Sequence, residues 1–331
     1  MKILMIAVND PAGTGIAFCR AVNRLDRKDR HSCRLATLET RYTHGWGKDL
    51  HVPDLDGEGL AELEQLLKTS DVLHFHMTAD EHLRLGPFLP AEYLSGKAVV
   101  HHEHGHHEFR SDPERFRAKY RALGRRNLLV STPDLLRLMP EARWQPNLVP
   151  EQEPLFRPVQ RDWSGPLTLA HSPTRKDLKN TDELLAVLGE LARAGVDVRL
   201  DLIDDVPHRE CLARKQAAHA LFDHMQGYYG VSSLEGLSQG LAVLAGLDEW
   251  NRAQVAEFAG TQDLPWVLAR DRDELASRLR ELAGDRDRCR AIGAASRRFM
   301  EHSWSEAKVA GRLADFWDGL ASGFAKGPEI V

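Results

Sequence analysis

The sequence predicts an α/β protein of two domains, each built on a doubly wound parallel sheet. Three observations predict this fold class. The chain has 331 residues, which is enough for two domains of roughly 150 residues each. Short apolar runs alternate with helical patterns through most of the chain, as in βαβ units. A proline-rich stretch near residue 150 separates two such series.

Composition and charge exclude several classes of protein. A net charge of −5 with 28% charged residues lacks the basic excess of a general nucleic-acid binder, so we expect no nucleic acid partner. No apolar run reaches the ~18 residues of a membrane span, and residues 1–8 are too short a run for a signal peptide, which favours a cytoplasmic protein. The cysteines form no Cys-x-x-Cys pair and predict neither a zinc site nor a disulfide framework. They are Cys19, Cys33, Cys211 and Cys289.

The first apolar run, Lys2 to Val8, predicts a strand that is buried on both faces. The loop after it carries Gly13 and Gly15 and leads into a helical stripe that ends near Leu25. This loop lacks the third glycine of a dinucleotide fingerprint, so a tight strand-to-helix turn is the ordinary explanation. Its place at the carboxyl end of a strand nevertheless makes Gly13 and Gly15 candidates for nucleotide contacts.

Further strands and helices are expected before residue 150, and histidines stand at two of the strand ends. The strands are expected at residues 33–38, 72–75, 98–102 and 128–131, and the helices at 59–67 and 113–123. Histidines occur in Leu73-His-Phe-His76 and in the run from Val100 to Arg110. Because the carboxyl ends of parallel strands share one edge, these histidines should face one crevice.

The second histidine run has three interpretations. A metal site needs several imidazoles on one face, and strand alternation separates His101 from His102 and His104, so we expect no metal ligands here. Imidazoles that hydrogen-bond across a loop are the structural alternative. A substrate site is the third interpretation and the one we favour.

A basic run in the first half has two interpretations. Arg117, Arg121 and Arg125 are spaced by four, which would place them on one side of a helix. A solvated helix face is the ordinary explanation. The alternative is peripheral contact with the inner membrane face, through anionic lipid or a lipid-phosphate acceptor.

Prolines 146, 150, 154 and 158 keep the chain extended and predict a linker that ends near Gly165. The second domain then begins with a strand, Leu167 to Ala170, and a helix that Asn180 or Thr181 can cap. Arg175 and Lys179 precede that helix. Cations beside the free N–H groups of a helix start make a site for a diphosphate.

The rest of the second domain continues the alternation. Strands are expected at residues 198–203, 241–245 and 265–269, and helices at 209–220 and 271–282. A Ser303/Glu306 capping box would open a final helix. Asp204 and Asp205 at a strand end point apart in an extended chain and make a poor metal chelate.

The stretch from Gly227 to Gly240 also has two interpretations. Ser232 can cap a short helix, with Glu235 three residues later completing a capping box. Alternatively, Gly227 and Gly230 let the backbone approach a ligand, and the helix start offers N–H groups to an anion.

The block Gly-Tyr-Tyr-Gly-x-x-x-Leu-Glu-Gly-Leu that starts at Gly227 resembles the nucleotide-sugar loop of retaining glycosyltransferases of family 4. The resemblance implies the GT-B fold, in which two Rossmann-like domains face a central cleft. It implies that Glu235 binds the ribose, with Tyr229 and Gly230 in the donor loop. Arg175 and Lys179 match the pair that holds the diphosphate.

The first half resembles the same family more loosely. The segment His104-Gly105-x-x-x-x-Arg110 is similar to the family's segment whose histidine faces the transferred sugar, which makes His104 a candidate catalytic residue. The resemblance implies an acceptor-binding domain over residues 1–160, a donor-binding domain over residues 161–304 and a final helix, 305–322, that packs back on the first domain. Asn147 matches the family's hinge.

The resemblance implies a nucleoside diphosphate sugar as donor, no cofactor and a glycan, lipid-linked glycan or small-molecule acceptor, as in polysaccharide biosynthesis. Transfer without a divalent metal is expected. The family commonly has a glutamate eight residues before the one that matches Glu235, and here that position is Gly227. Asp223, Gln226 or backbone N–H groups would then contact the sugar. A nucleotide-sugar 2-epimerase and a non-catalytic nucleotide-sugar-binding subunit are the alternatives.

Overall fold

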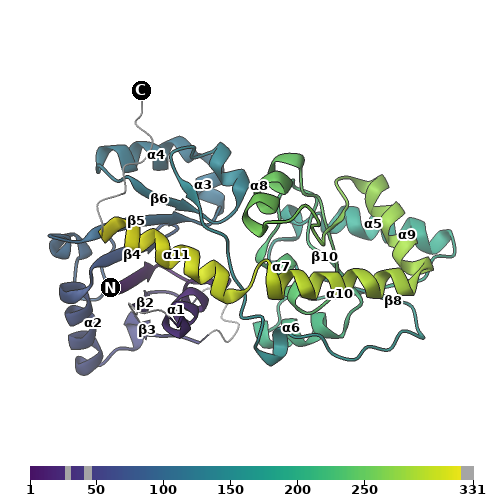
Figure 1. Cartoon of the computed structure of the whole chain (residues 1–331), viewed down its shortest axis with the longest axis horizontal. Coiled ribbons are helices and arrows are strands. Elements are labelled where there is room, and N and C mark those ends of the chain that lie inside the picture. Colours follow the sequence, from purple (N-terminus) through teal and green to yellow (C-terminus); the bar gives the residue numbers. More distant parts are fainter. Residues whose placement is uncertain (27–30, 41–46, 322–331) are drawn as a thin grey trace. The chain divides into compact units, whose positions relative to one another are not determined.

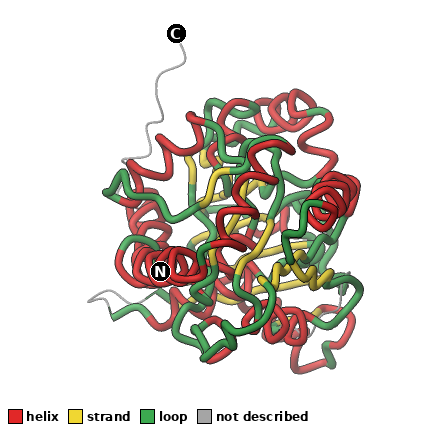
Figure 2. Tube along the Cα trace, turned by 90° about the vertical axis from the view of Figure 1, so that its right-hand side faces the viewer, coloured by secondary structure: helices red, strands yellow, loops and turns green. Residues whose placement is uncertain are grey.

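The computed structural model describes residues 1–26, 31–40 and 47–321. The chain divides into two compact units, one formed by Met1–Leu148 with the chain from Glu306 onward and the other by Val149–Ser305. In each unit the strands lie inside and helices lie around them (Figures 1 and 2). Among the described helices, none combines the length and the apolar character that crossing a membrane requires.

The first unit contains a parallel sheet with the strand order β3-β2-β1-β4-β5-β6-β7. Its strands are β1 (Lys2–Ala7), β2 (Ser32–Thr37), β3 (Leu50–His51), β4 (Val72–His76), β5 (Ala98–Glu103), β6 (Asn127–Val130) and β7 (Arg143–Trp144). Strand β1 is buried on both faces after Lys2, as its continuous apolar run predicts. The order turns back between β1 and β4, and doubly wound sheets bind ligands at the carboxyl side of such a point.

Helices of the first unit cover this sheet. They are α1 (Thr14–Arg24), α2 (Gly57–Thr69), α3 (His107–Ser111), α4 (Pro113–Ala122) and α11 (Glu306–Ala321). Buried Leu63 and Leu67 of α2 pack in one core with Leu4, Leu73 and Phe75 of the strands.

The expected Ser303/Glu306 capping box is wrong. Ser303 ends the preceding helix, and Glu306 is the first residue of α11, two positions too early for the box. The carboxylate of Glu306 accepts hydrogen bonds from Arg24 of α1 at 3.0 and 2.6 Å instead. The final residue of the expected helix, 322, lies outside the described residues.

The second unit contains a parallel sheet with the order β12-β11-β10-β8-β9. Its strands are β8 (Leu167–His171), β9 (Val198–Leu202), β10 (Ala220–Phe222), β11 (Ala242–Ala245) and β12 (Val267–Leu268). The sequence pattern does not indicate β10, because it predicts that the helix before this strand runs to residue 220, whereas α6 ends at Ala217. The order turns back between β8 and β10.

Helices of the second unit follow its strands. They are α5 (Thr181–Arg193), α6 (His208–Ala217), α7 (Val231–Ser238), α8 (Glu249–Ala259), α9 (Arg272–Gly284) and α10 (Arg286–His302). Leu184 of α5 and Leu279 of α9 are buried with Leu169, Phe222 and Leu244 of the strands in one core. Two parallel sheets flanked by helices confirm the predicted fold class.

Candidate functional site

Three helix starts at the carboxyl edge of the second sheet have no side-chain cap. Helices α5, α6 and α7 follow β8, β9 and β10, and none has a capping hydrogen bond from the side chain at its N-cap position. Helices α8, α9 and α10 differ, because Asp248, Asp271 and Asp285 cap them. Uncapped N–H groups at the carboxyl edge of a parallel sheet are suited to bind an anionic group.

A buried carboxylate lies at the point where the second sheet turns back. Asp223 directly follows β10, and its side chain is 1% exposed. Its carboxylate accepts hydrogen bonds from Lys179 Nζ at 2.9 Å, from the backbone N–H of Gly230 at 2.6 Å and from Ser233 Oγ at 2.8 Å. The ion pair therefore holds Lys179 beside the start of α7.

Gly230 packs closely against this ion pair. A Cβ atom at Gly230 would lie 3.0 Å from Lys179 Nζ and 3.2 Å from both Asp223 oxygens. The backbone at Gly230 therefore lies close to the Lys179–Asp223 ion pair. Gly227 has a φ of 87°, in the left-handed region that glycine tolerates best.

A second buried carboxylate, Glu235, lies on α7. Its oxygens accept hydrogen bonds from Lys215 Nζ at 2.5 Å and from His208 Nε2 at 2.8 Å. Lys215 also donates to Ser232 Oγ at 2.9 Å. Lys215 and His208 both come from α6, and no spacing in the sequence connects them with Glu235.

The surroundings keep both carboxylates ionised. Burial alone would raise the pKa of Glu235, yet the charges of Lys215 and His208 lower it to about 2. Burial would likewise raise the pKa of Asp223, but His224, Lys179 and the N–H of Gly230 hold it well below its usual range. A buried ionised carboxylate accepts hydrogen bonds only, and donors such as hydroxyls are its natural partners.

The expected capping roles of Ser232 and Asn180 are wrong. Gly230 is the N-cap residue of α7, so Ser232 falls in the first turn, where its hydroxyl contacts Lys215 and Ser172. Asn180 does occupy the N-cap position of α5, but its side chain accepts the N–H of Met225 at 2.9 Å and makes no cap.

The remaining candidates of the second unit lie around this cluster. Arg175 pairs with Asp177 on the surface, with half of its side chain exposed. The ring of Tyr229 is buried against Trp266 and Trp304, so only its backbone is left to contact a ligand. Gln226 donates to the carbonyl of Leu178 at 2.6 Å.

In the first unit, the loop with Gly13 and Gly15 is closed by an internal carboxylate. Asp10 accepts the N–H groups of Gly15 at 3.0 Å and Ile16 at 2.9 Å, at the start of α1. Gly13, with a φ of 64°, is the N-cap residue of α1. The Asp10 carboxyl group already accepts the N–H groups at this helix start, which favours the tight-turn interpretation.

Histidines gather on one face at the carboxyl ends of β4 and β5. His76 lies opposite His102 in the register of the two strands, and His74 and His104 lie two residues away along the chain. His76 Nδ1 and His104 Nε2 are 2.9 Å apart. Strand alternation sends His101 to the other face, as expected, where its ring stacks on Phe75.

Burial keeps these imidazoles neutral. It lowers the pKa of His76 to about 3 and the pKa values of His74, His102 and His104 well below the usual value. The expectation that no face gathers metal ligands rests on the histidine run after residue 100 alone. In the structure, His74 and His76 of the neighbouring strand lie on the same face as His102.

The basic run does not form one face of a helix. Helix α4 ends at Ala122, so Arg125 lies beyond it. Arg117 pairs with Glu141 at 2.8 Å, Arg121 pairs with Glu114, and Arg125 pairs with Glu81 at 2.6 Å. These carboxylates neutralise the guanidinium groups, so membrane contact through them has no support.

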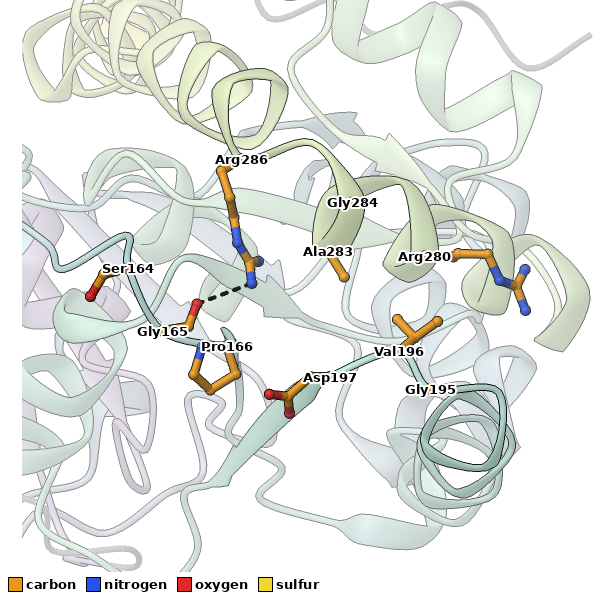
Figure 3. Close-up of a pocket in the computed structure, with 10 residues that line it drawn as sticks. All are labelled: Ser164, Gly165, Pro166, Gly195, Val196, Asp197, Arg280, Ala283, Gly284 and Arg286. Carbon is orange, nitrogen blue, oxygen red and sulfur yellow. Dashed lines mark hydrogen bonds between the residues drawn. The ribbon is translucent and has the colours of Figure 1, made fainter.

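An open pocket of about 500 Å³ lies at the other edge of the second sheet. It is lined by residues 164–166, just before β8, and residues 195–197, just before β9 (Figure 3). Arg286 donates to the carbonyl of Gly165 across it, at 3.2 Å. Its place at the amino ends of the strands separates it from the cluster around Asp223.

No family model and no curated protein matches the sequence, whereas many solved structures match the fold. An α-glucosyltransferase solved with UDP and DNA has 11% identity over 95% of this chain and 98% of its own, with a TM-score of 0.64. Anabaena HepE, solved with UDP and glucose, has 12% identity over 96% and 100%, with a TM-score of 0.61. A protein described as a UDP-N-acetylglucosamine 2-epimerase, from Listeria monocytogenes, has 12% identity over 98% and 97%, with a TM-score of 0.52.

A further match is TarM from S. aureus, at 12% identity and a TM-score of 0.55 over 78% of this chain. The present chain spans 58% of the length of that protein. Identities this low show the fold alone. The chain therefore has the GT-B fold, which its sequence predicts.

Proposed function

We propose that this protein is a retaining glycosyltransferase of the hexosyl type that moves a sugar from a nucleoside diphosphate sugar to a glycan, lipid-linked glycan or small-molecule acceptor. The observation that carries the proposal is the cluster at the turning point of the second sheet. There, Lys179 lies beside the uncapped starts of α5 and α7. The GT-B fold supports it, because glycosyltransferases are among the proteins that share this fold.

The chemistry of the cluster suits a diphosphate leaving group. Negative charge grows on the diphosphate as the sugar departs, and donors fixed in advance stabilise that charge. Lys179, the exposed Arg175 and the helix N–H groups would supply this compensation without a metal ion. Asp223 orients Lys179 and neutralises it until the diphosphate binds.

The ribose would bind to Glu235. Lys215 and His208 hold its carboxylate ionised and fixed in position, and a fixed carboxylate accepts two hydroxyl hydrogen bonds well. The three bonds that Asp223 already accepts make it a support for the loop, so backbone N–H groups around Gly227 are the better candidates for the sugar. His104 would contact the sugar or the acceptor, which the first unit would bind.

Calorimetry with nucleoside diphosphates tests the donor site. Ligands that bind only the folded state also raise its melting temperature, so thermal shifts can screen bases and sugars first. We would begin with UDP and UDP-glucose. Failure of every nucleoside diphosphate and its sugars to bind would remove the proposal.

The GT-B match to a protein described as an epimerase supports a second candidate, nucleotide-sugar 2-epimerisation. Incubation with the donor separates the alternatives. A transferase consumes the donor only when a suitable acceptor is added, and an epimerase changes the sugar without one. A binding subunit changes nothing.

A further inference from the structure

Three buried histidines of the first unit bring their ring nitrogens together. One ring nitrogen from each of His74, His76 and His102 lies within 4.8 Å of the others. His74 and His76 stand on the same face of β4, with ring centroids 4.6 Å apart, and His102 is the register partner of His76 on β5. Adjacent parallel strands therefore supply all three side chains.

Most of these nitrogens have no hydrogen-bond partner among the described residues. Both ring nitrogens of His74 and both of His102 are buried and unpartnered, and so is Nε2 of His76. A buried polar group without a partner costs roughly 1–3 kcal/mol, so five such atoms in one place need an explanation. A metal ion would account for three of the five, because it accepts the lone pair of one nitrogen from each neutral ring.

The fourth histidine fits a supporting role. His76 Nδ1 lies 2.9 Å from His104 Nε2, which leaves the unpartnered His76 Nε2 as the nitrogen available to a metal. Metal-bound histidines usually donate their second N–H to a nearby acceptor, which fixes the tautomer and the ring orientation. His76 Nδ1–H donating to His104 Nε2 has this form.

We propose that His74, His76 and His102 form a binding site for a transition-metal ion, with His104 as the hydrogen-bond acceptor that orients His76. Three imidazole nitrogens suit Zn²⁺, and also Co²⁺, Ni²⁺ and Cu²⁺, whereas Mg²⁺ and Ca²⁺ prefer oxygen. Zn²⁺ with three histidines keeps a fourth position for another ligand.

The geometry requires a small contraction. Zn–N bonds of about 2.0–2.1 Å place ligand nitrogens roughly 3.3 Å apart, against the 4.8 Å limit seen here. Changes in the side-chain torsions of the three histidines can close this difference. Phe18 of α1 and Trp317 of α11 pack against His102 and His74, so apolar rings wall the site.

The site belongs to the first unit and is independent of the diphosphate cluster. Both strand ends lie at the edge where doubly wound sheets bind ligands, near the candidate residue His104. Metal binding can therefore be tested without any donor, and failure of one proposal leaves the other intact.

The first experiment measures metal binding by the full chain after dialysis against EDTA. We expect one Zn²⁺ per chain by elemental analysis, and Co²⁺ to give visible absorption bands of a nitrogen-ligated ion. His76→Ala and His102→Ala should each weaken Zn²⁺ binding by at least about 100-fold, since second-shell changes alone cost about 10- to 100-fold. His107→Ala is the matched control, because His107 belongs to the same histidine run but is exposed on α3.

A metal site that survives His76→Ala and His102→Ala, or that is lost in His107→Ala, would overturn the proposal. The His104 variants test the supporting role. His104→Ala should weaken Zn²⁺ binding by about 10- to 100-fold, and His104→Gln should recover much of it because its amide oxygen still accepts the His76 N–H.

X-ray absorption at the zinc edge of the unmodified protein decides the matter if the buried-histidine variants fail to fold. The proposal predicts three imidazole ligands at about 2.0 Å. Fewer than three imidazoles, or no bound zinc at a protein concentration well above that of free zinc, would contradict it.

Discussion

Arg175 and Lys179 both belong to the proposed diphosphate site, yet their surroundings differ. Arg175 pairs with Asp177 at the surface, and Lys179 pairs with a carboxylate that is 1% exposed. We expect Arg175→Ala to weaken nucleoside diphosphate binding by about 10- to 100-fold, the loss of one charge-assisted hydrogen bond, with little change in stability. Lys179→Met should weaken binding and also cost about 2 kcal/mol of stability, because Asp223 loses its partner cation.

Calorimetry with UDP and urea denaturation measure the two effects. Arg193→Ala is the control, because Arg193 is exposed in the last turn of the same helix, α5, far from its start. Unchanged affinity in Arg175→Ala and Lys179→Met would remove the diphosphate assignment.

The ion pairs of Glu235 predict an acid-sensitive stability. Its pKa is about 2 in the fold, below the ordinary value of 4.5. Between pH 4.5 and 2 the unfolded chain binds a proton that the folded chain does not, so the stabilisation is complete above pH 4.5 and is lost as pH falls through this range. The loss is at most about 3 kcal/mol. Glu235→Gln should remove this part of the acid dependence.

Urea denaturation at pH 5 and pH 3 measures the difference. At pH 7 the same variant should be less stable than the wild type, because Lys215 stays buried without its counter-charge. Adding Lys215→Met should recover stability. Parallel pH profiles for wild type and Glu235→Gln would mean that folding does not lower the pKa of this carboxylate.

The cations of the site could be predicted from the sequence, whereas the ion pairs around Glu235 could not. The positions of Arg175 and Lys179 before a helix carried a physical signal, since cations are unfavourable there without an anion. Lys215 and His208 carried none, because their contacts with Glu235 depend on how α6 packs against α7. Which histidines share a face also depended on strand register, which joins His76 to His102.

At the scale of elements, the packing of α10 against α7 depends on one glycine. A Cβ at Gly293 would lie 2.3 Å from the carbonyl oxygen of Gly240, just beyond α7. Backbone cannot move aside cheaply, so we expect Gly293→Ala to destabilise the protein by about 2–3 kcal/mol. Gly189→Ala in α5 is the matched control, because nothing lies within 4 Å of its Cβ position.

The control should change stability in the opposite direction. Alanine in a helix interior is favoured over glycine by about 0.5–1 kcal/mol, so Gly189→Ala should stabilise the protein by that amount. Urea midpoints measure both variants. Equal midpoints for Gly293→Ala and wild type would show that α10 and α7 are not in this contact.

Helix α10 is absent from the helices predicted from the sequence, although its buried residues recur at helical spacing. They are Cys289, Gly293, Ser296, Phe299 and Met300, and the two small ones in the middle weaken the apolar stripe. Strand β10 was missed because it has only three residues and follows a helix. Long apolar runs such as β1 and amphipathic α5 were predicted well, since periodicity reports burial directly.

At the scale of the whole molecule, alternation of apolar runs and helices was enough to predict two parallel sheets. It could not predict which chain segments complete a unit, and the expectation that the final helix packs back on the first domain came from the family resemblance alone. Helix α11 belongs with the first unit although the whole second unit separates it from Leu148, and its Gln145–Val309 hydrogen bond at 3.1 Å joins distant parts of the chain. Such long-range contacts leave no local pattern.

The final prediction is that sugar transfer needs no divalent metal at the diphosphate. Mg²⁺ would need converging carboxylates, and each of the chain's three Asp-x-Asp sequences uses one carboxylate as a helix cap. Those capping residues are Asp56, Asp271 and Asp285. Asp204 pairs with Lys176. Protein cations and helix starts would compensate the leaving group, so transfer rates should survive EDTA.

Product formation with and without EDTA measures this. If EDTA lowers the activity, the metal ion that restores it shows which site is responsible. A loss that Mg²⁺ or Mn²⁺ restores would contradict metal-free transfer, because oxygen-preferring ions act at phosphates. A loss that only Zn²⁺ restores, and that Zn²⁺ no longer restores in His76→Ala, would arise from the histidines of the first unit. In that case the protein would need its metal on the sheet that carries His104, and the diphosphate chemistry would still rest on Arg175 and Lys179.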